Sequence, residues 1–577
     1  MSNGSETSPF RVITLHKADG LFRELEAIQE EHGFISAKDM GRIAERREMS
    51  VREVHAAVTF YPHLRTKPHD ARVEVVVCDD MSCHLRGSAE LTDRLMRRFG
   101  LTDPRDLAFR NVSCLGRCDQ APVFAVNERI FQAVDEQTIV NYIRRAMEGQ
   151  ELPHMTEAGY PATMQSDPYS NAAQHYSIVK QVAEKKNFDD VIAVLKSGDL
   201  RGMGGAGFPT NIKWDLVKKQ TRSPKYIVCN ADESEPGTFK DRLIMQELPH
   251  LLIEGMIIAG LCCGATKGYL YIRHEYEAPR ANLQREIDRA YQLGFLGKSV
   301  CGSGLSFDLE IFVSPGGYIC GEASALLEAL EGKRAEPRDK PPGTGTHGLW
   351  HLPTVLNNVE TFTFATTILA RGPEWFKQQG ANGAVGLKFI AVSGHVNKPG
   401  AFEVPMGLTY REIIDRHAGG VLGGKQLLGF APSGPSSGYL PASLADTPMD
   451  WKKLSDLGSM VGSAAVVVCA EGTCMLDMAI NSVRFFRNES CGKCVPCRMG
   501  TQKLVDLLVR WTRGEYRASD RETLRELSHT MKATSICGLG QIAPVPIESV
   551  LKHFPEQIED HIERRHCVGK VCFRDEE

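Results

Sequence analysis

The chain has 577 residues, a net charge of −4, 42% hydrophobic residues and 24% charged residues. This length predicts several domains, and the composition is typical of an ordinary globular protein. The small negative charge argues against binding to nucleic acid or to an anionic membrane surface.

Nothing in the sequence indicates export or membrane insertion. The start of the chain, Met1–Pro9, is polar and lacks the apolar core of a signal peptide. The most apolar stretch, residues 251–271, contains Glu254 and Lys267, so it predicts a buried helix followed by a strand. Seventeen cysteines without an export signal indicate a reducing compartment, where cysteines serve metals and redox chemistry. We therefore expect a cytoplasmic redox protein.

The first part of the chain alternates helices and strands. Residues 20–60 repeat apolar side chains at helical spacing. The elements expected next are a strand at 73–77, a helix at 88–99 and a strand at 123–126. Residues 151–177 are rich in Pro, Ser, Asn and Ala, which predicts a linker between domains.

Two closely spaced cysteine pairs lie in this first part. They are Cys78 with Cys83, directly after the first strand, and Cys114 with Cys118. Two such pairs suit the two irons of a 2Fe–2S cluster. Zinc remains the alternative, although these spacings are wider than those of a usual zinc knuckle. A thioredoxin-type redox disulfide would require Cys-x-x-Cys, which these pairs do not form.

A glycine-rich loop follows the linker. Its glycines are Gly202, Gly204, Gly205 and Gly207. The loop contains G-x-G-x-x-G, but a helical stretch precedes it and Pro209 follows it, so it is not an ordinary Rossmann fingerprint. Glycines at this density let backbone N–H groups approach a phosphate or a flat ring. A flexible turn without a ligand is the alternative.

Polar residues gather at the end of an expected strand, residues 226–229. They are Asn230, Asp232, Glu233 and Glu235. The carboxyl ends of strands are where α/β sheets bind cofactors. Glu235 is placed to accept hydrogen bonds from a ribose and to repel a 2′-phosphate, which favours NAD over NADP. A third group, Tyr318, Gly321 and Glu322, would bring an aromatic ring and a carboxylate to the same crevice.

The chain changes character near residue 387. A strand is expected at 388–392, and Thr409 with Glu412 forms a capping-box pattern at the start of a helix. The last hundred residues are mostly helical, with four cysteines in loops: Cys491, Cys494, Cys497 and Cys537. Three cysteines at two-residue spacing plus one distant cysteine are typical of a 4Fe–4S cluster, with zinc as the alternative.

The remaining cysteines have no assigned cluster. Cys229, Cys262, Cys263, Cys301, Cys320, Cys469 and Cys474 are interpreted as buried, unreactive thiols. Cys567 and Cys572, beside His566, form half a metal site at best. They are either ligands completed by another chain or part of a free tail.

These motifs carry a resemblance to a known family. The runs Gln29–Gly33 and Ala57–Tyr61 and the first four cysteines resemble the thioredoxin-like 2Fe–2S subunit of respiratory complex I, over residues 15–150. Residues 185–555 resemble the flavin-binding, NADH-oxidising subunit of complex I and its relatives in soluble hydrogenases and formate dehydrogenases.

The resemblance implies a multidomain α/β and α+β fold. The expected units are a helical lead-in (1–70), a thioredoxin-like 2Fe–2S domain (71–150), a linker (151–185), a Rossmann-like FMN and NAD domain (186–385), a ubiquitin-like β-grasp domain (386–465) and a helical 4Fe–4S bundle with a tail (466–577). FMN is expected within the glycine loop, with Lys213, Asn230, Asp232, Glu233, Tyr318, Gly321, Glu322, Asn357 and Asn358 around it. NAD is expected near Phe208 and Tyr318, with Glu235 at the adenosine ribose.

Three positions depart from the family pattern. Ala323 stands where a second glutamate is usual, and Leu216 where an aromatic residue would help to hold adenine. Met203 replaces an arginine common in complex I, and an apolar residue there resembles formate dehydrogenases.

The resemblance implies that FMN converts the electron pair of a nicotinamide into single electrons for the clusters, with no acid or base catalyst in the protein. Phe208, Glu235 and Tyr318 are then positioning residues. The sequence shows no molybdopterin, nickel or quinone site, so we expect one module of a larger complex. The expectation is the beta subunit of an NAD-dependent formate dehydrogenase, beside a molybdenum or tungsten iron–sulfur subunit. The alternatives are the corresponding subunit of a soluble NAD-reducing hydrogenase or of complex I. The non-catalytic alternative is an iron–sulfur scaffold that has lost its flavin.

Overall fold

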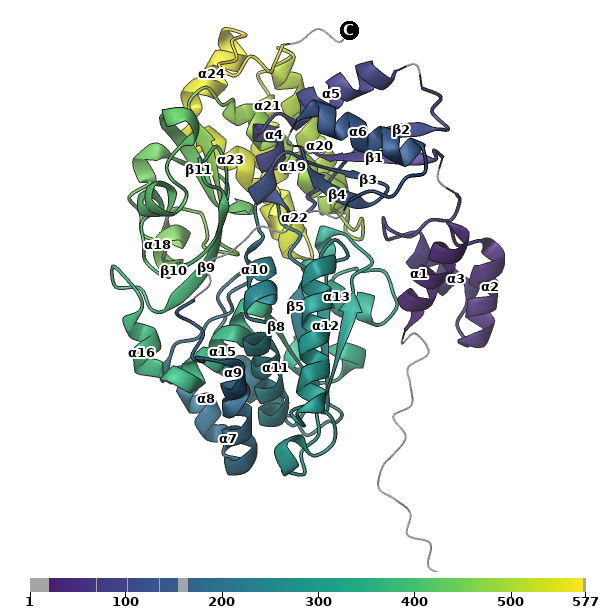
Figure 1. Cartoon of the computed structure of the whole chain (residues 1–577). Coiled ribbons are helices and arrows are strands. Elements are labelled where there is room, and N and C mark those ends of the chain that lie inside the picture. The colour runs from purple at the N-terminus through teal and green to yellow at the C-terminus, as the bar shows by residue number, and fades with distance from the viewer. Residues whose placement is uncertain (1–19, 69, 101, 134, 154–163, 574–577) are drawn as a thin grey trace, which may run out of the picture.

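The computed structural model describes residues 20–573 except 69, 101, 134 and 154–163 (Figure 1). The expectation for Met1–Pro9 and residues 154–163 of the expected linker therefore lie outside the described residues. Three sheets and a helical C-terminal region make up the described part.

The expected helical lead-in consists of α1 (Leu21–His32), α2 (Ala37–Arg46) and α3 (Val51–Val58). Capping boxes at Ser36 and Ser50 begin α2 and α3. The ring of Phe22 packs edge-on against Phe312, which belongs to the sheet of the central domain. The lead-in is thereby anchored to the central domain, and Arg65 at its end also pairs with Glu128 between β3 and β4 (2.6 Å).

The first sheet has the strand order β2-β1-β3-β4. Its strands are β1 (Val73–Cys78), β2 (Leu107–Val112), β3 (Val123–Val126) and β4 (Arg129–Gln132), and its helices are α4 (Met81–Leu85), α5 (Ser88–Phe99) and α6 (Glu136–Met147). β1 pairs in parallel with β2 and antiparallel with β3. The strands expected at 73–77 and 123–126 and the helix at 88–99 are confirmed, whereas β2 and β4 were not expected.

The central domain is built on a four-stranded parallel sheet of order β7-β6-β5-β8. Its strands are β5 (Tyr226–Ala231), β6 (Lys267–Ile272), β7 (Asp308–Val313) and β8 (Thr354–Asn358). Its helices are α7 (Ser177–Lys185), α8 (Phe188–Ser197), α9 (Thr210–Lys218), α10 (Lys240–Glu247), α11 (Pro249–Cys263), α12 (Glu277–Gln292), α13 (Ala323–Leu330), α14 (Thr344–His347), α15 (Val359–Arg371) and α16 (Pro373–Gln378). The two central strands, β5 and β6, are nearly continuous buried runs, as strands covered by helices on both faces require.

α11 is buried along almost its whole length, and β6 follows it, as expected. The carboxylate of Glu254, in the middle of α11, accepts hydrogen bonds from the N–H groups of Ile178 (3.0 Å) and Val179 (3.1 Å). Glu254 therefore caps the first turn of α7 from another helix. Among the described helices none alone could span a membrane; α10 and α11 meet the criterion only when joined, and they are bent by 93°.

The third sheet has the order β10-β9-β13-β11-β12. Its elements are β9 (Leu387–Gly394), β10 (Gly400–Pro405), α17 (Tyr410–Glu412), β11 (Leu427–Pro435), β12 (Leu440–Pro441), α18 (Trp451–Asp456) and β13 (Ala465–Ala470). The capping box of Thr409 and Glu412 forms as expected. The sheet includes β13, which lies beyond the boundary expected at residue 465.

The C-terminal region is a bundle of α19 (Met475–Asn488), α20 (Val495–Thr512), α21 (Asp520–Thr534), α22 (Gly538–Ile542), α23 (Val545–His553) and α24 (Pro555–Glu563). In Figure 1 it lies beside the first sheet, and Asn481 of α19 donates to the Asp79 carbonyl (2.6 Å) and accepts from the Met81 N–H (2.8 Å). We propose the domain division stated above, with β13 assigned to the β-grasp unit and α7 assigned to the central domain instead of the linker.

Candidate functional site

Polar residues line the carboxyl edge of the central sheet. β5 and β8 are neighbours, and their register places Asn230 opposite Asn358. Adjacent parallel strands end at the same edge, where α/β folds bind ligands. The Asn230 side chain donates to the Gly321 carbonyl (2.9 Å), which brings the expected Tyr318–Gly321 segment to this edge.

The glycine loop packs closely on this edge. A Cβ on Gly204 would come within 2.8 Å of the Asn358 Cβ, so a side chain there would displace Asn358. Gly207 has a φ of +68°, and a Cβ on it would lie 3.1 Å from the Trp451 ring. The Cβ position of Gly205 has no atom within 4 Å. The loop thus has a packed side and an open side, and its bare backbone suits a flat ring or a phosphate.

Lys213 supplies a half-buried amine beside the loop. Its Nζ donates to the Leu356 carbonyl of β8 at 2.8 Å, and burial lowers its pKa to about 8. Asn357 lies deeper than expected, because its Oδ1 accepts from the Trp214 indole N–H (3.1 Å). Lys213 is therefore the better placed of the two to meet an anionic ligand.

Asp232 and Glu233 differ in the partners that already occupy their carboxylates. Asp232 accepts from the hydroxyls of Ser234 and Ser314, and burial raises its pKa to about 6. Both oxygens of Glu233 accept from the start of α10, at the N–H groups of Asp241 (2.8 Å) and Arg242 (3.1 Å). Glu233 thus acts here as a helix cap, although we expected it to bind a cofactor.

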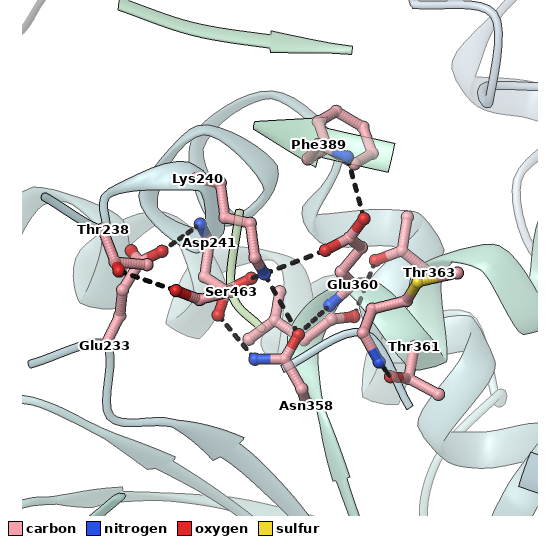
Figure 2. A network of polar contacts seen from close by, with 12 residues as sticks. Glu233, Thr238, Lys240, Asp241, Asn358, Glu360, Thr361, Thr363, Phe389 and Ser463 are labelled. Carbon is pink, nitrogen blue, oxygen red and sulfur yellow. Dashed lines mark hydrogen bonds and ion pairs between the residues drawn. The ribbon is translucent and has the colours of Figure 1, made fainter. Parts of the chain in front are cut away.

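A buried network of charges supports this edge (Figure 2). Lys240 contacts Asp241 at 2.6 Å and Glu360 at 2.9 Å, and the Asn358 amide donates to Asp241 at 2.6 Å. Burial alone lowers the pKa of Lys240, but the two carboxylates outweigh it and hold that pKa above its usual value. Glu360 also binds Lys388 and the Phe389 N–H of the β-grasp sheet. The network joins two domains behind the glycine loop.

Glu235 and Tyr318 converge on the β-grasp domain. The Ser436 N–H donates to Glu235 Oε1 (3.1 Å), and the Ser436 Oγ lies 3.5 Å from the Tyr318 hydroxyl oxygen. Burial raises the pKa of Glu235 to about 7. Phe208 is 52% exposed on the loop, so its ring is accessible to a ligand. These are the three residues expected to position a nicotinamide.

Glu322 is engaged locally. Its Oε2 accepts from the N–H groups of Ser324 (2.8 Å) and Ala325 (2.9 Å), and its Oε1 accepts from Lys340 (2.7 Å). It therefore caps α13 in this structure.

Four cysteines surround one small pocket in the C-terminal region. They are Cys491, Cys494, Cys497 and Cys537, and Ile319 also lines the pocket. All four are free thiols. Cys491 and Cys494 precede α20 and Cys537 precedes α22, whereas Cys497 lies on the first turn of α20 and not in a loop as expected. Four sulfurs around one hollow fit a 4Fe–4S cluster. Because Ile319 follows Tyr318, this pocket adjoins the expected nicotinamide position.

The other four cysteines meet at the end of β1. Cys114 Sγ lies 3.4 Å from Cys118 Sγ, and the sulfur of Cys78 lies within reach of those of Cys83 and Cys114. Backbone N–H groups donate to two of these sulfurs, from Gly116 to Cys114 (3.4 Å) and from Gly237 to Cys118 (3.3 Å). N–H donors aimed at buried sulfurs suit cluster thiolates.

Two buried arginines tie this cluster loop to the central domain. Arg273 donates to the carbonyls of Cys114 (2.8 Å) and Glu233 (2.6 Å), and Arg242 donates to the Gly116 carbonyl (2.8 Å). Sequence reasoning missed them, together with Lys240 and Lys388. One available signal was the charged run at residues 240–242, which opens α10 ahead of the apolar α11.

A cavity of about 900 Å³ opens between the thioredoxin-like domain, the central domain and α19. Ser234 and Tyr318 line it, together with Arg110, Arg117 and Arg273. Among the described residues that line it, none is a glycine of the loop. The loop and this cavity are therefore distinct features of the described structure.

Known families match four parts of the chain. These are the Nuo51 FMN-binding domain at residues 195–366, the NADH-ubiquinone oxidoreductase-F iron–sulfur binding region at 477–561, the thioredoxin-like [2Fe-2S] ferredoxin at 11–147 and the SLBB domain at 389–439.

The match to individual relatives extends over most of each relative's length. The NADH-quinone oxidoreductase F 2 subunit of Rhizobium meliloti (strain 1021) is 43% identical over 68% of this chain and 93% of its own. The NADP-reducing hydrogenase subunit HndC of Solidesulfovibrio fructosivorans is 40% identical over 66% of this chain and 78% of its own length. A chain of an NAD⁺-reducing [NiFe]-hydrogenase in the H₂-reduced state is 30% identical with a TM-score of 0.84, covering 95% of this chain and 94% of that one.

Proposed function

Because the chain belongs to the family of NADH-quinone oxidoreductase F subunits, we propose that it passes electrons between NAD(H) and a partner subunit. It is a flavin-dependent NADH dehydrogenase subunit whose cofactors are FMN, a 2Fe–2S cluster and a 4Fe–4S cluster. When bound, FMN exchanges an electron pair with a nicotinamide and single electrons with the clusters.

One short turn carries this proposal. In the segment Tyr318–Gly321, Tyr318 faces Ser436 beside Glu235, Ile319 lines the cysteine pocket and Gly321 bonds to Asn230. Three residues of this four-residue turn thus contact the expected nicotinamide position, the 4Fe–4S pocket and the expected flavin edge. Closeness of this kind is what electron transfer between the three groups requires.

The residues of the site bind and orient rather than transfer protons. The glycine loop and Lys213 would hold the flavin and its phosphate, with Asn230, Asp232 and Asn358 along the ring edge. Phe208 and Tyr318 would pack against the nicotinamide dinucleotide, and Glu235 would select for NAD. Glu233, Glu322 and Asn357 would support the site through the contacts described above.

For the complex as a whole, we infer the beta subunit of an NAD-dependent formate dehydrogenase, located in the cytoplasm beside a molybdenum or tungsten iron–sulfur subunit. The support is Met203, which is buried and whose carbonyl accepts from Lys388 (3.0 Å). A charged side chain at this buried position would lose its hydration, so an apolar residue fits the site. The fused arrangement of the [NiFe]-hydrogenase chain favours the hydrogenase alternative.

The test of the activity is a spectrum of the anaerobically purified protein before and after NADH. Prompt bleaching of flavin and iron–sulfur absorbance is expected. Bands that do not change would contradict the nicotinamide site. The first substitutions to try would then return Ala323 to glutamate and Leu216 to an aromatic residue, as the family pattern has them. A colourless protein that contains zinc at the cluster cysteines would contradict the redox function altogether.

The partner is identified by purifying the native complex and assaying NAD⁺ reduction with formate and with hydrogen separately. Formate-dependent reduction together with molybdenum or tungsten supports the formate dehydrogenase. Hydrogen-dependent reduction with nickel overturns it in favour of the hydrogenase, and NADH oxidation by quinone alone overturns it in favour of complex I.

A further inference from the structure

Four potential metal ligands converge near the C-terminus, outside both iron–sulfur sites. They are Cys474, His561, Cys567 and Cys572, and their ligand atoms all lie within 4.8 Å of one another. Three of these residues are buried and Cys572 is half-buried. We propose that they bind one zinc ion as a closed structural site.

The distances fit a single tetrahedral ion. Zinc lies about 2.3 Å from sulfur and about 2.0–2.1 Å from nitrogen, so tetrahedral ligands lie about 3.8 Å apart for two sulfurs and about 3.5 Å apart for sulfur and nitrogen. Cys474 Sγ lies 3.9 Å from Cys572 Sγ and 3.4 Å from His561 Nε2. A disulfide would need sulfurs about 2.05 Å apart.

The surrounding groups orient the ligands. The other ring nitrogen of His561, Nδ1, lies 2.6 Å from the Gln557 carbonyl oxygen, and because a carbonyl only accepts, Nδ1 carries the proton. The Nε2 lone pair is therefore directed at the sulfurs, as in other histidine metal sites. The Asp477 N–H donates to Cys474 Sγ (3.4 Å), a contact that stabilises a thiolate.

The backbone around the site holds its parts together. The Gln557 side chain accepts from the Met475 N–H (2.8 Å) and donates to the Thr473 carbonyl (3.2 Å). These two hydrogen bonds connect α24 to the backbone on both sides of Cys474. A Cβ on Gly569 would lie 3.1 Å from the Cys474 Cβ. A glycine between Cys567 and Cys572 thus lets the last segment approach Cys474 closely.

Three sulfurs and one imidazole favour zinc over the other metals of this protein. A four-coordinate site of this composition is typical of structural zinc. The sulfurs lie too close together and too near the imidazole for a multi-iron cluster to separate them. The sequence placed Cys474 among the inert thiols and paired Cys567 and Cys572 with His566. His561 and Cys474 of the same chain are the ones that complete the set.

The site would brace the helix between the two clusters. Cys474 caps the start of α19, and the cysteine loop of the 4Fe–4S pocket begins shortly after its end. The same helix bonds to Asp79 through Asn481, next to the cluster cysteine Cys78. The ion would therefore fasten residues 567–572 to a helix that contacts both cluster domains.

The experiment uses the full-length protein, purified anaerobically with a tag that lacks histidine, and measures zinc by mass spectrometry. One zinc per chain is expected. The variants Cys567→Ser and Cys572→Ser should lose at least about nine-tenths of it, and the matched control Cys301→Ser should retain it. Electron paramagnetic resonance of the reduced protein should show both iron–sulfur signals in all three variants.

Zinc-edge X-ray absorption of the unmodified protein tests the site without any variant. Three sulfurs at about 2.3 Å and one nitrogen at about 2.0–2.1 Å are expected. Absence of zinc, iron in its place, a shell of oxygen and nitrogen only, or zinc retained in both serine variants would each overturn the proposal. Loss of zinc in Cys301→Ser would overturn it as well.

Discussion

Lys240 Nζ lies 2.9 Å from Glu360 Oε2, and neither side chain has any solvent-exposed surface. Lys240 also contacts Asp241, whose other oxygen accepts from Asn358 at the edge where the flavin is expected. Removing one member of a buried ion pair leaves an uncompensated charge in a medium that solvates it poorly. This pair is therefore a structural support for the cofactor edge.

Lys240→Met should destabilise the central domain by about 3–5 kcal/mol. The thermal midpoint should fall by about 10 °C for a domain of this size, and FMN should be released more readily. Differential scanning fluorimetry and filtration of free flavin measure these changes. Lys67→Met is the control, because Lys67 pairs with Asp70 (3.1 Å) at the surface, where a pair contributes less than about 1 kcal/mol. Equal effects of the two substitutions would contradict the role of Lys240.

Glu254 should control the opening of α7. Glu254→Leu leaves the N–H groups of Ile178 and Val179 without their acceptor, at about 1–3 kcal/mol for each group. Hydrogen exchange of these two amides should accelerate. The control Glu184→Leu, at an exposed position of α7, should leave their exchange unchanged. Protection that survives Glu254→Leu would show that the cap is not needed.

The pH dependence of this cap follows from the Glu254 pKa, which burial raises to about 7 from 4.5. A raised carboxyl pKa means that the folded state binds the proton more tightly than the unfolded state. The stabilisation of the folded state that comes from this raised pKa is thus complete below about pH 4.5 and is lost as pH rises through about 7. Glu254→Gln, which cannot ionise, should remove this part of the pH dependence of stability.

Local patterns predicted the strands at 73–77, 123–126, 226–229 and 388–392 and grouped the cysteines that the structure brings together, because strand ends and cysteine spacing are visible within a few residues. β2 escaped notice because it lies at the edge of its sheet and carries the exposed Arg110 and Asn111. The pairing of Lys240 with Glu360, and of Cys474 with Cys567, joins residues far apart in the chain. Only the folded arrangement of α10, α15, α19 and α24 reveals such partners.

Glu235 should set the preference between the two nicotinamide cofactors. Burial raises its pKa to about 7, so the carboxylate that would repel a 2′-phosphate forms only as pH rises through that value. Tyr318, its ionisable neighbour, stays neutral, because burial raises its pKa well above 10. The ratio of kcat/KM for NADPH to that for NADH should therefore fall between pH 6 and pH 8.

Glu235→Gln should raise this ratio about 10-fold at pH 8 and weaken its dependence on pH. Glu374→Gln, at an exposed position, should behave like the unmodified protein. Steady-state kinetics with both nucleotides give the ratio directly. An unchanged ratio in Glu235→Gln would remove Glu235 from the specificity site.

Cys537→Ala should remove the 4Fe–4S signal and leave FMN bound. The cysteine enters its pocket from the loop between α21 and α22, whereas the glycine loop and Lys213 belong to the central domain. Electron paramagnetic resonance of the reduced protein should lose one set of signals, and the flavin released by heating should be unchanged. Cys263→Ala, a buried cysteine of α11 outside the cluster sites, controls for the loss of a buried thiol. Loss of FMN together with the cluster would mean that the Tyr318–Gly321 turn, which touches both sites, couples their assembly.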